Sequence, residues 1–401
     1  MTPEQIVKSV DRQSFIKAAV ILVSAGFFLL MWTFSIPHPE RTEFKVAAPF
    51  GITPAQPYYS EGFTSSASTQ KAHAATISAI DNKLVSFWYG GSEEGARDVQ
   101  IFQASFSGNK WSRASAVIGP AKVQSDLRRF VRKVGNPVVL HWPDGRTWLF
   151  FVSVSVGGWA GSSINLIESD DGGMTWTKVR RLITSPFLNL STLVRNSAVF
   201  YTDGSIGLPV YHEFIGKFGE ILRINSNGRI LGKKRLSHGK SSLQPVIIPT
   251  SKTEAIGLMR YAGAPPMRLL QFKTVDGGNS WSLASKLQVQ NPNSSVDAIH
   301  VGSGRILAAI NNSPMSRSSL HLAISFAGQD WNIFHELEAV DVSPVSHEFE
   351  FSYPSFTRDG KGLFHLAYSW NHKHIKHVRF NETWLNLKLM SNQTAAVIKQ
   401  P

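Results

Sequence analysis

Two arginines follow polar or apolar runs in a way that makes them candidates for binding an anion. Arg260 comes directly after Ile256–Met259, a run typical of a buried strand. An unpaired charge in an apolar core is costly, so a strand-embedded arginine has few explanations other than an anionic ligand. Arg317 follows two asparagines and could join Arg260, although an exposed loop would explain it as well. The pattern therefore predicts a site for a carboxylate or a similar anion.

Candidate acids, bases and hydroxyl groups also lie next to strand-like segments. The segment 88–99 carries two glutamates and the pair Arg97-Asp98 in a glycine-rich loop after a strand. Such a loop can hold a carboxylic acid for proton transfer, although surface turns have the same composition. The other candidates lie at the ends of strand-like segments: Glu213, Tyr353 and Tyr368. Together these groups could supply acid–base and nucleophilic chemistry.

A repeated pattern, Ser/Thr-x-Asp-x-Gly-x-Ser/Thr-Trp, indicates the elements that would position these groups. It occurs at residues 169–176 and again at residues 274–281. The aspartate accepts hydrogen bonds from its own turn, the glycine permits positive φ, and the tryptophan buries a large ring under the hairpin. The pattern is therefore a turn stabiliser rather than a catalytic site, and its recurrence indicates a repeated β architecture.

The tryptophan of this pattern recurs at intervals along the chain. The series is Trp111, Trp176, Trp281, Trp331 and Trp384, with gaps of 65, 105, 50 and 53 residues. The gap of 105 fits two periods in which one repeat lacks its tryptophan, with a degenerate hairpin at 225–230. Six repeats result, and no sustained helical period occurs after residue 45. Residues 61–390 are therefore predicted to form an all-β six-bladed β-propeller, which the periodicity favours over a β-sandwich.

The N-terminal part has a different composition. Residues 18–36 carry no charge, and as a helix they would extend roughly 29 Å, enough for a transmembrane signal-anchor helix. Basic residues precede this run, so residues 1–17 are predicted to be a cytoplasmic tail and the propeller to be periplasmic or extracellular. A cleaved signal peptide is the alternative, but the run is long for one and no small-x-small site follows it immediately. Residues 37–60 would be a proline-containing stalk, and residues 391–401 part of an extended tail.

Composition restricts the chemistry further. The chain has no cysteine, which excludes disulfides, a thiol nucleophile and a cysteine metal site. Its net charge of +13 comes from scattered basic residues, apart from the run 128–133, and no nucleic-acid motif is present. An acidic glycan or anionic lipid headgroups are therefore expected as partners, and nucleic acid is not.

Four histidines cluster late in the chain: His365, His372, His374 and His377. His372 and His374 would share one strand face and could bind a metal ion. No carboxylate or cysteine accompanies them at short range along the chain, so no metal site is predicted. No cofactor is predicted either.

The repeated turn resembles the Asp-box, or BNR repeat, of the sialidase superfamily, whose members are β-propellers. Further phrases are similar to the sialidase-like family that carries bacterial neuraminidase repeats: 87–95, 135–138, 208–213, 243–245, 291–294 and 352–355. The similarity extends over about residues 73–380, roughly three quarters of the chain.

The resemblance implies roles for the candidate residues. Asp98 would protonate the leaving oxygen, and Glu213 would take the proton of the nucleophile Tyr353. A tyrosine suits an anionic sugar, because the substrate's own charge would repel a carboxylate nucleophile. The resemblance also implies that Arg260 and Arg317 bind the substrate carboxylate. The remaining substrate-binding candidates are His73, Arg97 and Tyr368, with Tyr368 also the reserve nucleophile.

The chain departs from the family at the first of the three arginines that bind the carboxylate. The Phe/Tyr-Arg-Ile/Leu-Pro motif is absent, and His73 occupies the region where that arginine is expected. A histidine cannot form the same planar fork to a carboxylate.

Three functions are consistent with these residues. The resemblance implies a sialidase-like glycoside hydrolase. It would be an exo-glycosidase that acts on a terminal acidic sugar of a glycan or exopolysaccharide. A polysaccharide lyase on a uronate-containing glycan is an alternative, in which an arginine neutralises the carboxylate while His73, His212 or Tyr353 removes a proton. A non-catalytic, membrane-tethered glycan-binding propeller is the third, because fold alone does not settle function.

Overall fold

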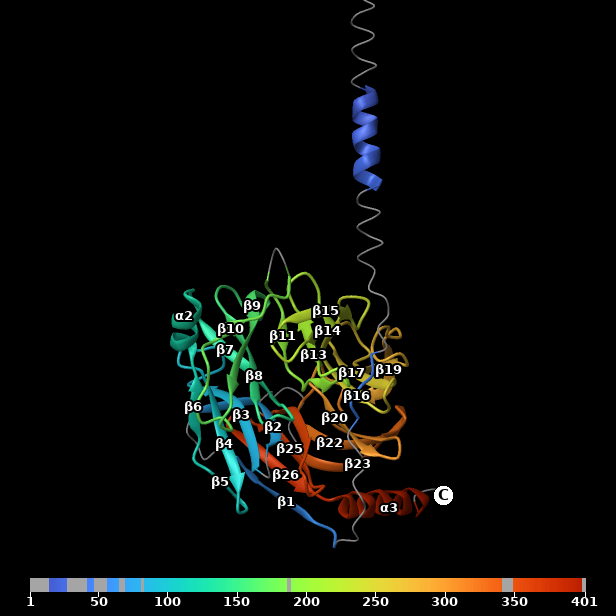
Figure 1. Cartoon of the computed structure of the whole chain (residues 1–401). Helices are drawn as coiled ribbons and strands as arrows, with labels where there is room; N and C mark the ends of the chain where they lie inside the picture. The colour runs from blue at the N-terminus through green and yellow to red at the C-terminus, as the bar shows by residue number, and fades with distance from the viewer. Residues whose placement is uncertain are drawn as a thin grey trace, which may run out of the picture. The chain divides into compact units, whose positions relative to one another are not determined.

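The computed structural model describes residues 14–26, 42–46, 56–64, 69–80, 83–185, 189–340 and 349–398, with side chains up to residue 392 (Figure 1). The chain divides into two units, residues 1–42 and 43–401. In the first unit, residues 14–26 are helical. Of the helices in the described ranges, none is long and apolar enough to cross a membrane. The predicted anchor at 18–36 lies partly outside the described residues, as does most of the 1–17 tail, so both stay predictions.

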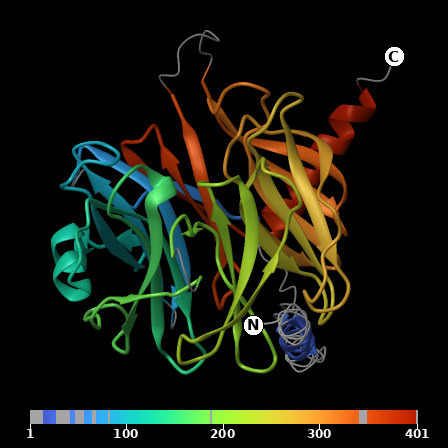
Figure 2. The ribbon, with the colours of Figure 1, turned by 90° about the horizontal axis from the view of Figure 1, so that it is seen from above.

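The second unit consists of six antiparallel sheets arranged around a common centre, as the view in Figure 2 shows. The first blade contains β2 (Lys71–Ile80), β3 (Lys83–Gly91), β4 (Gln100–Ser107) and β5 (Lys110–Trp111), with β6 (Ser115–Ile118) also pairing with β4. The second contains β7 (Lys133–His141), β8 (Thr147–Val154), β9 (Ser162–Ser169) and β10 (Arg180–Arg181). In the third, β11 (Leu193–Val194) and β12 (Val199–Phe200) pair with β13 (Ile206–His212), followed by β14 (Phe218–Ile224) and β15 (Ile230–Arg235).

The other three blades repeat this order. The fourth contains β16 (Ser242–Pro249), β17 (Ala255–Tyr261), β18 (Arg268–Thr274) and β19 (Ser285–Gln290). The fifth contains β20 (Asp297–Gly302), β21 (Arg305–Ile310), β22 (Ser319–Phe326) and β23 (Gln329–Ala339). The sixth contains β24 (Phe351–Arg358), β25 (Phe364–Trp370), β26 (His374–Phe380) and β1 (Tyr59–Phe63). The predicted six-bladed β-propeller is confirmed.

The first strand of this unit closes the ring. β1 pairs antiparallel with β26, with Tyr59 opposite Phe380, so a segment from before the first blade forms the outer strand of the last. The chain after β26 is then free to form a helix, α3 (Glu382–Ile398). Asn381 Oδ1 caps this helix by accepting a hydrogen bond from the backbone N–H of Trp384 at 2.9 Å. Trp384 therefore closes no hairpin of its own.

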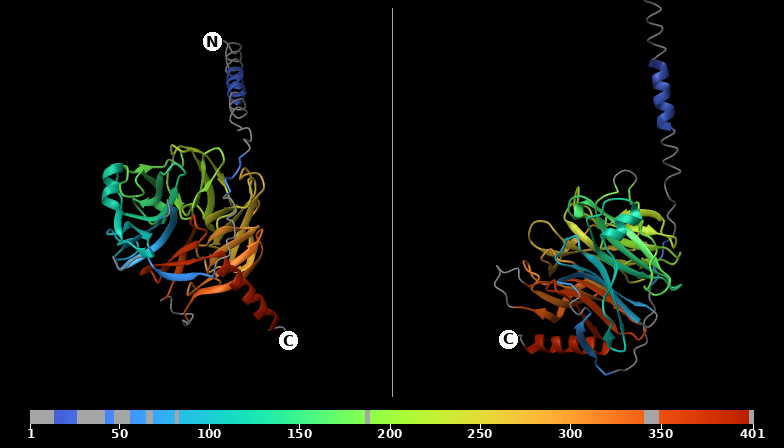
Figure 3. Two further views of the ribbon diagram at one scale, coloured as in Figure 1. Left: turned by 60° about the horizontal axis from the view of Figure 1, so that its bottom comes forward. Right: turned by 90° about the vertical axis from the view of Figure 1, so that its left-hand side faces the viewer.

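Two sequence expectations about the ends of the propeller are corrected. Residues 391–398 of the expected extended tail belong to α3, which packs against β23, where Asn392 Nδ2 donates to the carbonyl of Ile333 at 3.2 Å (Figure 3). Part of the expected stalk packs on the propeller, because Phe44 is fully buried and stacks on Tyr201 with ring centres 4.9 Å apart. Apolar burial explains this difference, since the stalk was inferred from its prolines alone.

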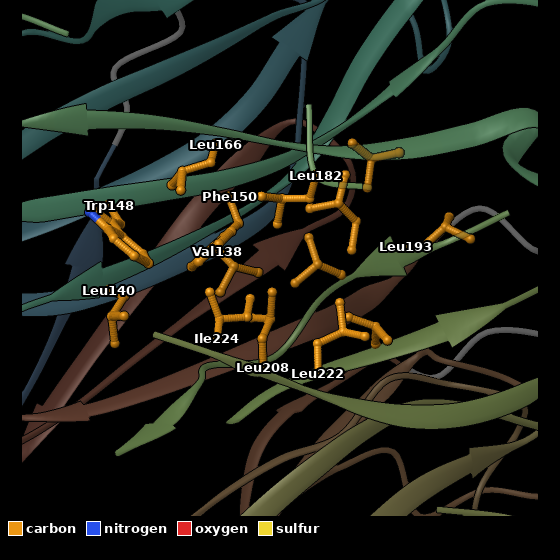
Figure 4. Close-up of a cluster of buried hydrophobic side chains, with 14 of the residues drawn as sticks. Val138, Leu140, Trp148, Phe150, Leu166, Leu182, Leu193, Leu208, Leu222 and Ile224 are labelled. Atoms are coloured by element: carbon orange, nitrogen blue, oxygen red, sulfur yellow. The ribbon is translucent and has the colours of Figure 1, made fainter. Parts of the chain in front are cut away.

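Each interface between neighbouring sheets is filled by a separate hydrophobic cluster. Figure 4 shows the cluster between the second and third blades, where Trp148 and Phe150 of β8 lie among leucines of β13 and β14. The alternating side chains of each strand supply both faces of its sheet, so each blade contributes to two such clusters. These six clusters thus pack neighbouring blades against one another.

The two complete repeats are turns, as predicted. Asp171 Oδ1 accepts hydrogen bonds from the backbone N–H groups of Met174 and Thr175, both at 2.9 Å. Asp276 Oδ1 accepts one from Ser280 N at 2.9 Å in the second copy. Both turns connect the third and fourth strands of a blade, on its outer side and away from the innermost strands. Two short helices, α2 (Pro120–Leu127) and the 3-10 turn Trp159–Gly161, lie in the connections of the first and second blades.

Candidate functional site

Bulges in the innermost strands shape the centre of the propeller. β2, β7, β16 and β24 each shift register near their start, and each bulge contains a non-glycine residue with φ between 47° and 55°. These residues are Ala74, Asn136, Gln244 and Tyr353. A bulge bends its strand and re-aims the neighbouring side chains, and left-handed residues of this kind are concentrated at functional sites. Four blades thus use the same local device to present side chains at the centre.

The hydroxyl of Tyr211 joins two of these bulges. It accepts hydrogen bonds from Asn136 Nδ2 at 3.2 Å and from Gln244 Nε2 at 3.3 Å. All three side chains are buried, with 6% of Asn136, 2% of Tyr211 and 3% of Gln244 exposed. Burial raises the pKa of Tyr211, so its phenol stays protonated at neutral pH. These residues connect the second, third and fourth blades.

Asn293 brings the two predicted arginines together. Its Oδ1 accepts from Arg260 Nε at 2.5 Å, and its backbone carbonyl accepts from Arg317 Nη2 at 2.7 Å. Arg260 also donates to Gln244 Oε1 at 3.3 Å. The two guanidinium groups therefore share one neighbour, as a site for an anion requires.

The charges of the two arginines are balanced differently. Arg317 Nη1 donates to Glu350 Oε1 at 2.8 Å, and Glu350 Oε2 lies 3.3 Å from His372 Nε2. Burial opposes ionisation of Glu350, but the hydrogen bond to His372 and the charge of Arg317 hold its pKa well below the usual range. Within the described part of the chain, Arg260 has no carboxylate hydrogen-bond partner. Arg260 is therefore the arginine with charge left for a ligand.

His73 lies against three aromatic rings. Its ring stacks on His372 with centres 4.2 Å apart, and it meets the rings of Tyr353 and Tyr89 edge-on at 4.7 and 5.6 Å. The side chain is 3% exposed, and its Nδ1 has no hydrogen-bond partner among the described atoms. Burial, and then the neighbouring His372, lower the pKa of His73 well below 6.5. His73 is consequently neutral at pH 7.

Tyr353 is supported from across the centre by Arg195. The guanidinium of Arg195 lies 5.1 Å from the ring centre of Tyr353, and its Nη2 donates to the carbonyls of Tyr353 at 2.6 Å and Pro354 at 3.0 Å. Arg195 is 2% exposed. The hydrogen bonds of its Nη2 are made to the bulge itself, so Arg195 positions Tyr353.

Glu213 is the half-buried carboxylate of the third blade. Its backbone N–H donates to Ser191 Oγ at 2.8 Å. Burial raises the pKa of Glu213, and the charges of Arg260 and Lys217 oppose that rise. Glu213 and Tyr353 both act electrostatically on Tyr211, which places the two in the same neighbourhood.

The loop after β3 presents a different carboxylate from the one predicted. Asp98 accepts hydrogen bonds from the backbone N–H and the hydroxyl of Ser92, both at 2.9 Å, and so stabilises its own exposed loop. Glu94 instead is hydrogen-bonded to Tyr89 and lies close to His73. A glutamate and an aspartate four residues apart could not be distinguished from the loop's composition, because both are followed by the same strand.

Two other predicted residues lie apart from the central contacts. Arg97 lines an open cavity of about 510 Å³ beside Glu93 and Glu94. Tyr368 is fully buried, and its hydroxyl donates to Glu338 Oε1 at 2.7 Å on the other side of the sixth blade's inner strands. The structure therefore groups Tyr368 with the packing of the fifth and sixth blades.

The residues that are linked pairwise by these contacts, together with Glu213, which interacts electrostatically with Tyr211 and Arg260, form what we call the central cluster. Its predicted members are His73, Glu213, Arg260, Arg317 and Tyr353. The members that the sequence interpretation missed as site residues are Tyr89, Glu94, Asn136, Arg195, Tyr211, Gln244, Asn293, Glu350 and His372. Arg195 follows the apolar pair Leu193-Val194 and carries the same signal that identified Arg260.

Solved structures with the same fold include several sialidases. The chain matches the Hadza microbial sialidase Hz136 with a TM-score of 0.63 at 14% identity, over 79% of this chain and 67% of that one. It matches the NanB sialidase from Streptococcus pneumoniae with a TM-score of 0.63 at 9% identity, over 88% and 72%. It matches the Trypanosoma rangeli sialidase with a TM-score of 0.61 at 14% identity, over 83% and 57%. At these identities the likeness shows the fold.

Sequence comparison identifies the family. No curated protein sequence matches the chain significantly. The family model for the BNR repeat-like domain matches residues 82–366, which is more than half of the chain and includes both complete Asp-boxes. With the six-bladed propeller and the sialidase-like fold, this match shows that the chain belongs to the BNR repeat-like domain family of the sialidase superfamily.

Proposed function

We propose that this chain is a sialidase-like glycoside hydrolase that acts on a terminal acidic sugar of a glycan or exopolysaccharide. The observation that carries the proposal is the attachment of Arg260 and Arg317 to one residue, Asn293, in the cluster that also contains Tyr353. An anion-binding pair beside a tyrosine is what hydrolysis of an anionic sugar requires.

Arg260 would make the main contact to the sugar's carboxylate. Its described partners are amide oxygens, so a carboxylate ligand would supply the opposite charge that the site lacks there. Arg317, already paired with Glu350, would contribute a weaker interaction. His73 stands where the family's first arginine is expected and, being neutral, adds no charge.

Tyr353 would act as the nucleophile in two steps. Its hydroxyl oxygen forms a bond to the anomeric carbon while the bond from that carbon to the leaving oxygen breaks. Glu213 accepts the phenol proton, and Glu94 donates a proton to the leaving oxygen. Water then attacks the anomeric carbon and gives a proton to Glu94 while the bond from that carbon to the Tyr353 oxygen breaks, and the released phenolate recovers its proton from Glu213. Glu94 takes the role that the sequence assigned to Asp98.

One observation favours β-elimination at a uronate as a second candidate. His73 is neutral, lies against Tyr353 and has an unpartnered ring nitrogen. A neutral imidazole or the tyrosine could remove a proton next to a carboxylate that Arg260 neutralises. The same cluster would then break the glycosidic bond without water.

The cellular setting is proposed from the sequence. The uncharged run 18–36 would be an uncleaved membrane anchor with residues 1–17 in the cytoplasm. The propeller would then meet its glycan in the periplasm or outside the cell.

Product analysis tests the proposal. The full chain is incubated separately with sialosides and with uronate-containing polysaccharides, while released sugar and ultraviolet absorbance are followed together. Hydrolysis predicts released acidic sugar without new absorbance, and Glu213→Gln should slow it at least about 100-fold. New absorbance would replace the hydrolase with the lyase, because only elimination creates an unsaturated sugar. Glycan binding without either product would support the third function, a non-catalytic glycan-binding propeller.

A further inference from the structure

We propose that His73, Glu94 and His372 form a binding site for a divalent transition-metal ion of the zinc class. One ring nitrogen from each histidine and one carboxylate oxygen of Glu94 all lie within 4.8 Å of one another. Two imidazoles and a carboxylate are a ligand set that zinc and its neighbours in the first transition row prefer. The three side chains come from β2, the loop after β3 and the turn before β26.

The buried state of His73 points to a ligand. Its Nδ1 has no hydrogen-bond partner among the described atoms, although the side chain is 3% exposed. An unpaired buried polar atom costs free energy, and a metal ion would satisfy it.

His372 has the support that metal-binding histidines usually have. Its Nε2 lies 3.3 Å from Glu350 Oε2, which leaves Nδ1 for another partner. A carboxylate on the far ring nitrogen fixes the tautomer and the orientation of a ligating histidine. Arg317 in turn holds Glu350 through its other oxygen at 2.8 Å. A second layer of contacts is therefore already in place.

Charge and space at the site suit a cation. The carboxylates of Glu94 and Glu350 lie among basic groups that include Arg317 and Lys71, which lines the same cavity, so the two acids supply the negative charge available to an ion. A cavity of about 190 Å³ is lined by all three ligands and by Glu93. Zinc holds tetrahedral ligands about 3.4 Å apart, and the exposed side chain of Glu94 can supply the small closing movement.

Three protein ligands would leave one coordination position open toward the cavity. Open positions of this kind hold water or an oxygen atom of a substrate. A bound ion would hold Glu94 as an ionised ligand, so the acid role that the proposed hydrolase gives to Glu94 requires the metal-free site. This consequence rests on the proposed function, whereas binding of the ion does not.

The sequence alone predicts no metal site, because no carboxylate lies near the histidines along the chain. Glu94 comes from the first blade and His372 from the sixth, and the closed ring brings them together. The site is thus a product of the propeller's closure.

Calorimetric titration of the chelator-treated full chain with Zn²⁺ tests the proposal without any substrate. We expect one ion per chain, with affinity at least about tenfold weaker in His372→Ala and in Glu94→Gln. Mg²⁺ should bind much more weakly, because it prefers oxygen ligands. The matched control is His238→Ala, which removes an exposed histidine elsewhere and should bind Zn²⁺ as the wild type does.

The same variants separate binding from folding. Each is first melted in chelator, where a midpoint like that of the wild type shows an intact fold, and then with Zn²⁺, which should raise the midpoint of the wild type and of His238→Ala only. No bound ion, or equal binding in His372→Ala and Glu94→Gln, overturns the site. Because no sugar is present, the outcome of this titration does not depend on whether the proposed hydrolase function is correct.

Discussion

Arg195 of the third blade reaches across the centre of the propeller and lies over the ring of Tyr353 of the sixth, 5.1 Å from the ring centre. Its Nη2 donates to the carbonyls of Tyr353 and Pro354, the two residues of the bulge. Tyr353 has φ of 55°, which is unfavourable for a tyrosine unless neighbouring contacts fix it. The buried arginine is therefore the contact that fixes the proposed nucleophile.

The first prediction concerns that contact. Arg195→Lys keeps the charge but loses the planar guanidinium, whose Nη2 donates to both carbonyls and whose plane lies over the ring. We expect the free energy of unfolding to fall by about 1–3 kcal/mol and turnover of an acidic glycoside to fall with it. Chemical denaturation of the variant beside the exposed control Arg113→Lys measures the first effect. Equal stability of both variants would contradict the positioning role.

The second prediction concerns Asp297, which is buried near Arg195. Burial raises its pKa to about 6, although the N–H of Phe356 and the charge of Arg195 oppose the rise. Since the folded pKa exceeds the unfolded one, the stability that Asp297 contributes is fully present below about pH 4 and is lost as pH rises through about 6.

Asp297→Asn keeps an acceptor for Phe356 N–H and removes the titration. The variant should therefore gain stability relative to the wild type by roughly 3 kcal/mol between pH 4 and pH 7. Denaturant unfolding of both proteins across this range measures the difference. A difference independent of pH would show that Asp297 does not titrate in this way.

The architecture could be predicted from the sequence more completely than the site. The Asp-box turns and the tryptophan period depend on local hydrogen bonding and packing, so the residues near each turn reveal them. Trp384 fits the tryptophan period only by coincidence, because it lies in the first turn of α3 and not at the end of a hairpin. The predicted number of blades is nevertheless correct, because β1 completes the sixth sheet, which needs no such turn.

The central cluster depends on contacts between residues far apart in the chain. Arg260 and Arg317 were recognised from their apolar or polar surroundings, but Asn293, which joins them, was noted only within the family-like phrase 291–294 and not as a site residue. Glu94 was passed over for Asp98 because only the folded loop shows which carboxylate points to His73. Pairings across the ring cannot be read from spacing.

The third prediction concerns the segment before the first blade. Phe44 is fully buried against Tyr201, and its backbone N–H donates to the carbonyl of Lys252 at 2.7 Å. Phe44→Ala should therefore lower the free energy of unfolding by about 3–5 kcal/mol. The matched control is Phe63→Ala, whose side chain is 46% exposed and should cost much less. Similar losses in the two variants would mean that Phe44 does not pack as described.

The fourth prediction concerns acid stability at the closure of the ring. His377 lies between Trp111 Nε1, which donates to its Nδ1 at 3.3 Å, and His365 Nδ1, 3.0 Å from its Nε2. Burial, and then the neighbouring His365, lower the pKa of His377 to about 3. The stability it contributes is present above about pH 6.5 and is lost as pH falls toward 3.

His377→Gln should consequently weaken the dependence of stability on pH between 6.5 and 4, even if it lowers stability at neutral pH. Thermal melting of the two proteins over this range compares the slopes. Parallel slopes for wild type and variant would assign the acid sensitivity to other groups.

The most direct test of the account compares the two tyrosines that the sequence offered as nucleophiles. Tyr353 lies in the central cluster, whereas Tyr368 is buried with its hydroxyl bonded to Glu338. The measurement is the rate at which Tyr353→Phe and Tyr368→Phe release acidic sugar from a glycoside that the wild type hydrolyses, with glycan binding measured in parallel. We predict a loss of at least about 100-fold in Tyr353→Phe with binding retained, and a rate within a few-fold of wild type in Tyr368→Phe. Undiminished hydrolysis by a folded Tyr353→Phe variant would contradict the account.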